Sequence, residues 1–174
     1  MRRYLLLAIV AMSGLLLGAV AQAQAPAPAP APIPDAIPFD VPYGMSITLE
    51  RAKQVAAAAA GEARKRNWKM AIAIVNTSGD LVYFEKLDDT QIGSVAVSQG
   101  KAKTAALFRR PSKAFFDAME SGHPYVATLH PGIVAADGGL PIIESGKVIG
   151  AIGVSGGTGA QDAVVAKAGV DAVK

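Results

Sequence analysis

Residues 138–157 read GGLPIIESGKVIGAIGVSGG, and this stretch decides the fold. Two apolar runs rich in Ile and Val flank the tetrapeptide 144–147, whose Gly146 supplies the positive φ that a tight turn needs. The stretch is therefore predicted to form a β-hairpin. The second run contains Gly150 and Gly153, and glycine weakens a strand. We therefore expect another backbone or a ligand to approach closely at these two positions.

The polar residues 155–158 that follow the hairpin lead into a last predicted helix. A glycine-rich turn between a strand and a helix can bind phosphate, but the spacing here matches neither a dinucleotide-binding fingerprint nor a P-loop. Ser155 stands in a G-x-S-x-G pattern at 153–157. A hydrolase triad of that type places its acid and its histidine after the serine, whereas both histidines of this chain precede it. These residues therefore predict neither nucleotide binding nor acyl transfer.

Upstream of the hairpin, the sequence predicts a helix that begins after Thr48, a good N-cap, and ends near residues 64–67. Its buried face is predicted to be rich in small residues: Leu49, Ala52, Ala56, Ala59, Ala60 and Ala63. A second hairpin follows, formed by the apolar runs 70–75 and 81–85. Two helices come next, the first ending near Phe108 and the second spanning 113–121 with Ser112 as its predicted N-cap.

The predicted order is thus helix, hairpin, two helices, long loop, hairpin and helix. Two hairpins make an antiparallel sheet, and the helices must cover its faces to bury the apolar runs. The sequence therefore predicts an α+β fold, with an antiparallel sheet built from two hairpins and flanked by helices.

The N-terminal segment predicts export. Residues 1–4 are positively charged, residues 5–20 are apolar, and Ala21-Gln22-Ala23 provides a small-x-small cleavage site. Residues 1–23 are therefore interpreted as a signal peptide, which predicts a periplasmic or secreted protein with no membrane span after cleavage. Residues 2–3 are both arginine, so general and twin-arginine export both stay open. The alanine- and proline-rich residues 24–44 are interpreted as a semi-rigid linker, and residues 45–174 as the folded domain.

Charge and cysteine content exclude further classes of function. Cleavage of the signal peptide would remove Arg2 and Arg3. The mature chain would then have 15 of the 17 basic residues and 14 acidic residues, which gives it a formal charge of +1. A nearly neutral domain is not expected to bind nucleic acid, which requires a strongly basic face. The sequence contains no cysteine, which excludes disulfides, thiolate metal sites and a cysteine nucleophile.

Four blocks of sequence carry a family resemblance: AIVNTSGDLV at 73–82, KAKTA at 101–105, GGLPI at 138–142 and IGAIGVSG at 149–156. Over about residues 46–174 the chain resembles the GlcG-like family, which includes secreted haem-binding proteins of the HbpS type. The resemblance implies an antiparallel sheet flanked by helices and assembly into dimers or larger homo-oligomers. It also implies haem binding or a role beside glycolate or diol utilisation. Haem-binding relatives are described as using a histidine of the N-terminal helix as iron ligand, and residues 48–67 contain none.

The two histidines of the chain, His123 and His130, lie in the long loop 122–137, and each precedes a proline. Imidazole is a common ligand of haem iron, so either histidine is a candidate axial ligand. The alternative is that both are exposed loop residues held rigid by their prolines. No third ligand at a suitable spacing predicts a zinc site, so no metal other than haem iron is expected.

Five basic residues occur between Asp89 and Asp117 without an acidic residue among them: Lys101, Lys103, Arg109, Arg110 and Lys113. One interpretation is a solvated helix face. The other is a site for a carboxylate, either a haem propionate or a short hydroxy acid, with Lys101, Arg109 and Arg110 as candidate partners. The sequence thus favours an exported, homo-oligomeric haem-binding protein. The alternative is an accessory enzyme or binding subunit for a small hydroxy acid without haem.

Overall fold

The structure, a computed structural model, describes residues 36–37 and 39–173. The predicted signal peptide, residues 1–23, and most of the predicted linker lie outside the described residues. The compact unit begins at Ala36, ahead of the predicted start at Met45. The reason is that the segment before the first helix pairs with the sheet: Gly44 N donates to Val148 O at 2.8 Å and Val148 N donates to Pro42 O at 2.8 Å.

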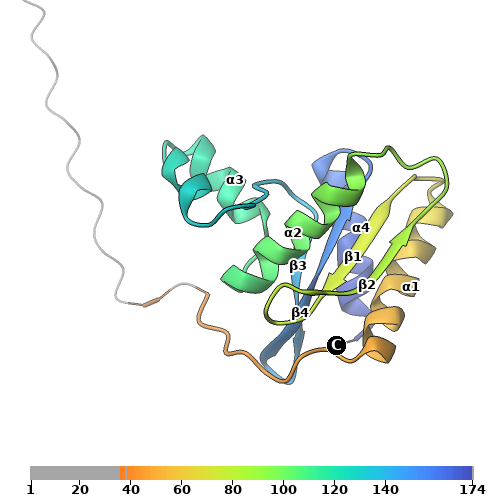
Figure 1. Ribbon diagram of the computed structural model, residues 1–174, viewed down its shortest axis with the longest axis horizontal. Coiled ribbons are helices and arrows are strands. Elements are labelled where there is room, and N and C mark those ends of the chain that lie inside the picture. The colour runs from red at the N-terminus through yellow and green to blue at the C-terminus, as the bar shows by residue number, and fades with distance from the viewer. Residues whose placement is uncertain (1–35, 38, 174) are drawn as a thin grey trace, which may run out of the picture. The chain divides into compact units, whose positions relative to one another are not determined.

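The observed order of elements confirms the predicted one, with one short 3-10 helix added inside the long loop (Figure 1). The elements are α1 (Leu49–Lys65), β1 (Ala71–Val75), β2 (Leu81–Lys86), α2 (Ser94–Phe108), α3 (Lys113–Glu120), η1 (Pro124–Thr128), β3 (Gly139–Glu144), β4 (Lys147–Ser155) and α4 (Gly159–Asp171). Among the described residues, none of the helices is both long and apolar enough to cross a membrane.

The four strands form one antiparallel sheet in the order β2-β1-β4-β3, so the two hairpins meet through β1 and β4. Every residue of β1 is buried, which is the pattern of a central strand covered on both faces. Pro141 stands in β3, at the edge of the sheet, where a strand tolerates a residue without an N–H. The antiparallel α+β prediction is therefore confirmed.

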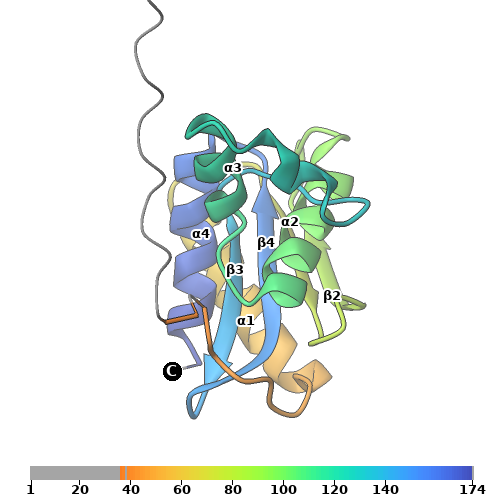
Figure 2. The same ribbon diagram turned by 90° about the vertical axis from the view of Figure 1, so that its left-hand side faces the viewer.

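Helices cover both faces of the sheet: α1 and α4 pack on one and α2 packs on the other (Figures 1 and 2). Side chains alternate along β1 accordingly, because successive residues of a strand point to opposite faces. Ile72 and Ile74 join the core beneath α1 and α4, whereas Ala73 and Val75 join a smaller core beneath α2. The α2 side is lined by small residues, so this helix lies close to the sheet.

Glycine makes that close approach possible. A Cβ at Gly153 would lie 2.0 Å from Ser98 O in α2, and a Cβ at Gly150 would lie 2.3 Å from Val75 O in β1. Both distances are far below van der Waals contact, so neither position accepts a side chain without displacing backbone. The prediction that another backbone approaches at these two glycines is confirmed.

Local signals fixed most of the element ends. Thr48 Oγ1 accepts a hydrogen bond from Arg51 N, as expected of an N-cap. Ser145 and Gly146 form the turn of the β3–β4 hairpin with φ of 49° and 73°, so the predicted positive-φ turn is present. One expectation for α1 is wrong: Leu49 is 51% exposed, and Val55 takes part in the buried face instead.

Candidate functional site

The predicted site residues lie in three separate places. Lys101 is inside the molecule, Arg109 and Arg110 stand at the C-terminal end of α2, and both histidines belong to the segment around η1. The three places differ in burial and in partners, so they have different chemical capacities.

Lys101 is 2% exposed and already holds a carboxylate. Its Nζ donates to Asp162 Oδ2 at 2.7 Å and to Val154 O at 3.0 Å. Asp162 accepts a further hydrogen bond from Gly157 N at 3.0 Å. Burial raises the pKa of the Asp162 carboxyl, and the hydrogen bonds from Lys101 and Gly157 oppose that rise. This ion pair would have to separate before Lys101 could receive the carboxylate of an outside ligand.

Sequence reasoning missed Asp162 as the partner of Lys101. The two residues are 61 positions apart, and no spacing rule connects them. The one signal was the place of this acid in the first turns of α4, directly before the apolar Ala163-Val164-Val165. An acid there also fits the positive end of a helix dipole at the surface, so this position does not by itself indicate burial.

The glycine pair at the start of β3 covers this ion pair. A Cβ at Gly138, whose φ is +107°, would lie 2.7 Å from the Asp162 Cβ and 3.2 Å from Lys101 Nζ. A Cβ at Gly139 would lie 2.5 Å from Lys101 O. The two glycines therefore let the chain pass directly over the buried charges.

Ser112 stands at the N-cap position of α3, as predicted, but its side chain makes no capping hydrogen bond there. Its Oγ donates to Ala136 O and accepts a hydrogen bond from Gly139 N at 2.9 Å. The hydroxyl is used instead to attach the loop, and Thr104 Oγ1 attaches it further by accepting from Val134 N at 3.0 Å.

Arg109 and Arg110 are partly buried against the segment that precedes α1. We call residues 39–43 the strap. Arg109 Nη1 donates to Val41 O at 3.0 Å, and its guanidinium lies 5.5 Å from the centre of the Tyr43 ring. The Tyr43 hydroxyl is 2.9 Å from Ala106 O and 2.9 Å from Leu107 O at the end of α2.

Arg110 stands among three aromatic rings. Its guanidinium lies 4.5 Å from the ring centre of Phe39, 5.3 Å from that of Phe115 and 5.9 Å from that of Phe108. Burial, and to a lesser extent the charge of Arg109, lowers the pKa of Arg110. Both guanidinium groups thus lie near the surface, where they could bind a carboxylate. The strap already contacts Arg109 Nη1 and the Arg110 guanidinium.

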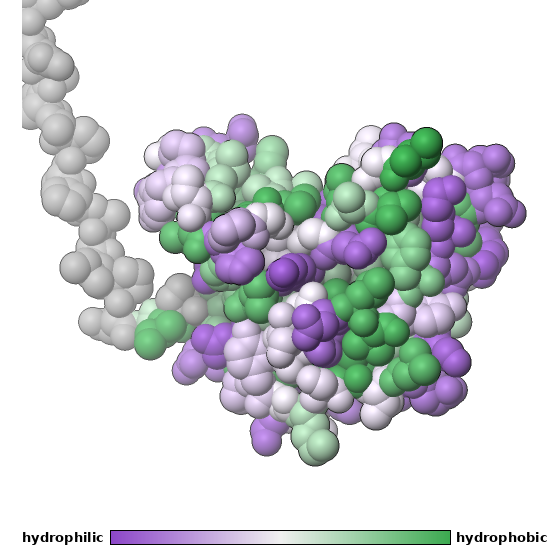
Figure 3. All heavy atoms as spheres, viewed as in Figure 1, coloured by the Kyte–Doolittle hydropathy of each residue, from purple (hydrophilic) through white to green (hydrophobic). Residues whose placement is uncertain are grey.

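The histidines stand on a part of the chain that we call the lobe, residues 113–131, comprising α3, η1 and the adjoining turns. His123 is exposed, its Nδ1 lies 3.4 Å from Ser121 Oγ, and its ring meets the Tyr125 ring edge-on at 6.0 Å. His130 is half-buried. Four large apolar side chains of the lobe are also exposed: Phe116 (45%), Met119 (37%), Tyr125 (60%) and Leu129 (55%). Figure 3 shows hydrophobic and hydrophilic residues side by side on this part of the surface.

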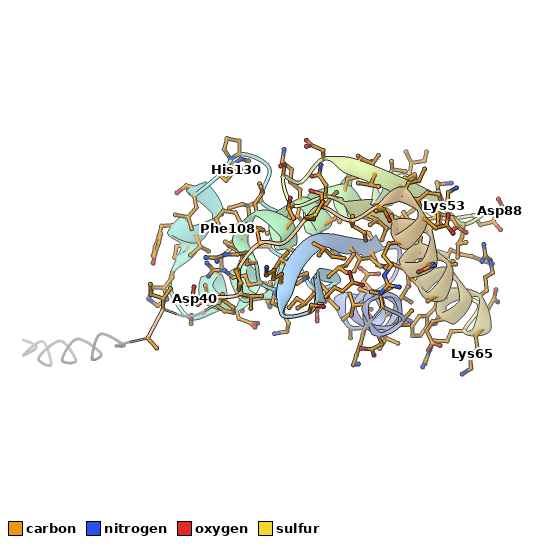
Figure 4. The ribbon with its side chains drawn as sticks, turned by 90° about the horizontal axis from the view of Figure 1, so that it is seen from below. Asp40, Lys53, Lys65, Asp88, Phe108 and His130 are labelled. Atoms are coloured by element: carbon orange, nitrogen blue, oxygen red, sulfur yellow. The ribbon has the colours of Figure 1, made fainter. Side chains whose placement is uncertain are left out.

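The strap and the lobe share one end of the molecule. Figure 4 places Asp40, Phe108 and His130 at that end, with Lys65 and Asp88 at the opposite end. A hollow of about 340 Å³ lies at the opposite end between α1 and β2. Its lining is mostly polar: Arg64, Asn67, Trp68, Lys69, Glu85, Lys86, Leu87 and Asp88. Neither histidine belongs to it, so this hollow and the lobe are two distinct candidate sites.

Two features bear on other chemistry. Over residues 36–37 and 39–173, no group of three or more His, Asp or Glu side chains is arranged to hold a metal ion. Ser155 is 5% exposed and its hydroxyl donates to Ser94 Oγ at 3.1 Å. Ser155 is thus bonded to another hydroxyl within the core.

The fold and these sites define an α+β domain with a four-stranded antiparallel sheet and a histidine-bearing lobe at one end. The sequence model of the family described as "Haem degrading protein HbpS-like" matches residues 47–171. The chain belongs to this HbpS-like family.

Relatives and solved structures agree with this membership. Protein GlcG of Escherichia coli K12 is 40% identical over 109 residues, covering 63% of this chain and 81% of GlcG. An uncharacterized 15.0 kDa protein of Citrobacter freundii, from the dhaT-dhaS intergenic region, is 36% identical over 129 residues, covering 72% of this chain and 91% of that protein. The structure of a double mutant of Streptomyces reticuli HbpS has a TM-score of 0.70 at 27% identity, covering 84% of this chain and 99% of HbpS.

Proposed function

We propose that this protein is an exported haem-binding protein that acts in haem storage, scavenging or degradation. The observation that carries the proposal is the lobe, which exposes both His123 and large apolar side chains, in a chain whose family is described as haem degrading. Haem needs both properties in a binding surface, because its porphyrin faces are apolar and its iron binds imidazole.

The contact of His123 with Ser121 supports its candidacy as an axial ligand. If its Nδ1 donates the 3.4 Å hydrogen bond to Ser121 Oγ, the lone pair is on Nε2 and can bind iron. Tyr125 packs edge-on against the imidazole and limits its rotation. His130 is the second candidate ligand, since it belongs to the same segment of chain.

Arg109 and Arg110 are the candidate partners of the haem propionates. Arg110 contacts Phe115 of α3, so the arginines adjoin the lobe. A guanidinium presents donors in a fork that matches a carboxylate. Lys101 is a weaker candidate, because Asp162 and Val154 already hold its ammonium group.

Titration with haem tests this proposal. The expected result is a Soret band that saturates at a defined stoichiometry and shifts in His123→Ala, because loss of an axial imidazole changes the ligand field of the iron. Arg109→Ala and Arg110→Ala should weaken affinity and leave the band position unchanged, because propionate pairing does not touch the metal.

Lys65→Ala, at the opposite end of the molecule (Figure 4), is the matched control. Spectra and affinities that stay at wild type in both His123→Ala and His130→Ala would reject the lobe as the haem site.

Export is the part of the proposal that rests on sequence alone. Cleavage after Ala23 would leave a mature chain that starts near Gln24, and the protein would be found in the periplasm or the medium. Intact-mass measurement on protein recovered from those fractions checks this, and a mass that still includes residues 1–20 would contradict it.

The alternative is a binding subunit or accessory enzyme for a small hydroxy acid. The polar hollow of about 340 Å³ favours this alternative, because its lining contains Lys69 and Lys86; Arg64 also lines it but is paired with Glu85 at 2.6 Å. Calorimetric titration with glycolate distinguishes the two. Binding of glycolate that Lys69→Ala and Lys86→Ala abolish, together with no saturable haem binding, would favour the alternative.

A further inference from the structure

The strap is held over the two arginines by contacts that a ligand can replace. Arg109 donates a hydrogen bond to a neutral acceptor of the strap, Val41 O. The Arg110 guanidinium lies 4.5 Å from the centre of the Phe39 ring and contacts it through a cation–π interaction. A ligand carboxylate would form an ion pair with Arg109, in which both partners are charged, whereas only the donor is charged in the bond to Val41 O.

The tip of the strap has a strained backbone. Phe39 has a φ of 61°, in the left-handed region that bulky residues avoid. Phe39 is also 40% exposed, so little burial offsets the strain. Strain at Phe39 favours release of its contact with Arg110 when a competing partner is present.

The other end of the strap is attached firmly. Val148 N donates to Pro42 O at 2.8 Å, so this end is paired with β4. The Tyr43 hydroxyl binds the last carbonyls of α2. Residues 39–41 can therefore turn away about Pro42 while Tyr43 stays in place, and this movement frees Arg109 Nη1 and one face of Arg110.

We propose that the strap is a lid over a binding site for a planar, carboxylate-bearing ligand. With residues 39–41 displaced, the ligand carboxylate pairs with Arg109 and the ligand plane takes the place of the Phe39 ring on Arg110. This inference deepens the proposed function, on which it rests, by assigning a gate to the arginines that would receive the acidic edge of haem.

The test uses 1-pyrenecarboxylate, a fluorescent planar carboxylate, and 1-pyrenemethanol as its neutral counterpart. Phe39→Ala in the full chain should tighten binding of the carboxylate about three- to tenfold, because the closed strap no longer competes through the ring. It should leave the alcohol unaffected. Ile37→Ala is the matched control, because it removes an apolar side chain that is 75% exposed and lies two positions before Phe39. Arg109→Ala and Arg110→Ala should weaken binding of the carboxylate.

Several results would overturn the proposal: unchanged or weaker carboxylate binding in Phe39→Ala, equal tightening for both probes, or no binding of the carboxylate by any variant. A second measurement uses the wild-type protein. Saturating 1-pyrenecarboxylate should accelerate chymotrypsin cleavage after Phe39, and an unaltered cleavage rate there would also refute the lid. Because the probe contains no iron, the result is independent of whether His123 or His130 binds haem.

Discussion

Replacing Lys101 with methionine would leave a carboxylate in the core without its cation. The two side chains are similar in length, so the change removes charge and hydrogen bonds more than volume. Asp162 would keep its hydrogen bond from Gly157 N but lose the ammonium group at 2.7 Å. Breaking a buried pair by removing one partner costs about 3–5 kcal/mol. A domain of this size has a stability of about 5–15 kcal/mol, so we expect the midpoint of thermal unfolding to fall by roughly 10 °C or more.

Urea and thermal unfolding at neutral pH measure this loss. Lys103→Met is the matched control, because Lys103 is an exposed lysine two positions further along α2, and it should change the free energy of unfolding by about 0.5 kcal/mol or less. Lys101→Met combined with Asp162→Asn should be more stable than Lys101→Met alone, because no uncompensated charge is then buried. A loss in Lys101→Met no larger than that in Lys103→Met would refute the reasoning.

The loss should also depend on pH. Burial raises the pKa of Asp162, and Lys101 opposes the rise, so Lys101→Met should raise the pKa of Asp162 in the folded protein further. The folded variant then binds the proton more readily than the unfolded chain does. The stability that Asp162 contributes to the variant is fully present below the pKa of this carboxyl in the unfolded chain. It is lost as the pH rises through the pKa of Asp162 in the folded variant. The deficit against wild type should therefore be smaller at pH 5 than at pH 8, and the opposite order would count against the assigned shift.

Three further predictions concern the fold and its assembly. Gly153→Ala should destabilise the protein by about 1–3 kcal/mol, because the new Cβ would meet Ser98 O at 2.0 Å; wild-type stability in urea would contradict the close packing of α2. Thr158→Ala should cost about 1 kcal/mol, because Thr158 and Gln161 form a capping box at α4; an unchanged urea midpoint would argue against that cap. The family resemblance predicts at least a dimer at micromolar concentration, although the small-residue face of α1 packs inside the subunit and is not available to an interface; light scattering that gives a monomer throughout the accessible range would contradict the prediction.

The helices, strands and turns were predicted well because their sequence signals depend only on nearby residues. The Ser145-Gly146 turn, the Thr48 cap and the continuous apolar run of β1 each depend on neighbours within a few positions. Gly150 and Gly153 marked close approach correctly, because a strand has few other uses for glycine. The family resemblance likewise implied an antiparallel sheet flanked by helices, whereas the strand order β2-β1-β4-β3 was not predicted.

The candidate site was predicted less completely because it depends on distant partners. Lys101 belongs to a basic run that also fits an exposed helix face, and only the fold brings Asp162 to it. Ser112 precedes a helix as an N-cap does, but the carbonyl of Ala136 takes its hydroxyl. The contact of the strap with Arg109 joins residues 68 positions apart. Export, assembly and the identity of the iron ligand stay predictions.

The strand order also determines when the protein can fold. Each hairpin is local in sequence, but the sheet closes only when β1 pairs with β4, with Ala71 beside Ser155. Contacts between such distant segments form slowly, because closing the long loop between them costs conformational entropy before the contacts stabilise the protein. A nascent chain that lacks β4 therefore has a single two-stranded hairpin, which is marginally stable at best in water. The polypeptide should thus stay unfolded until almost its whole length has been synthesised.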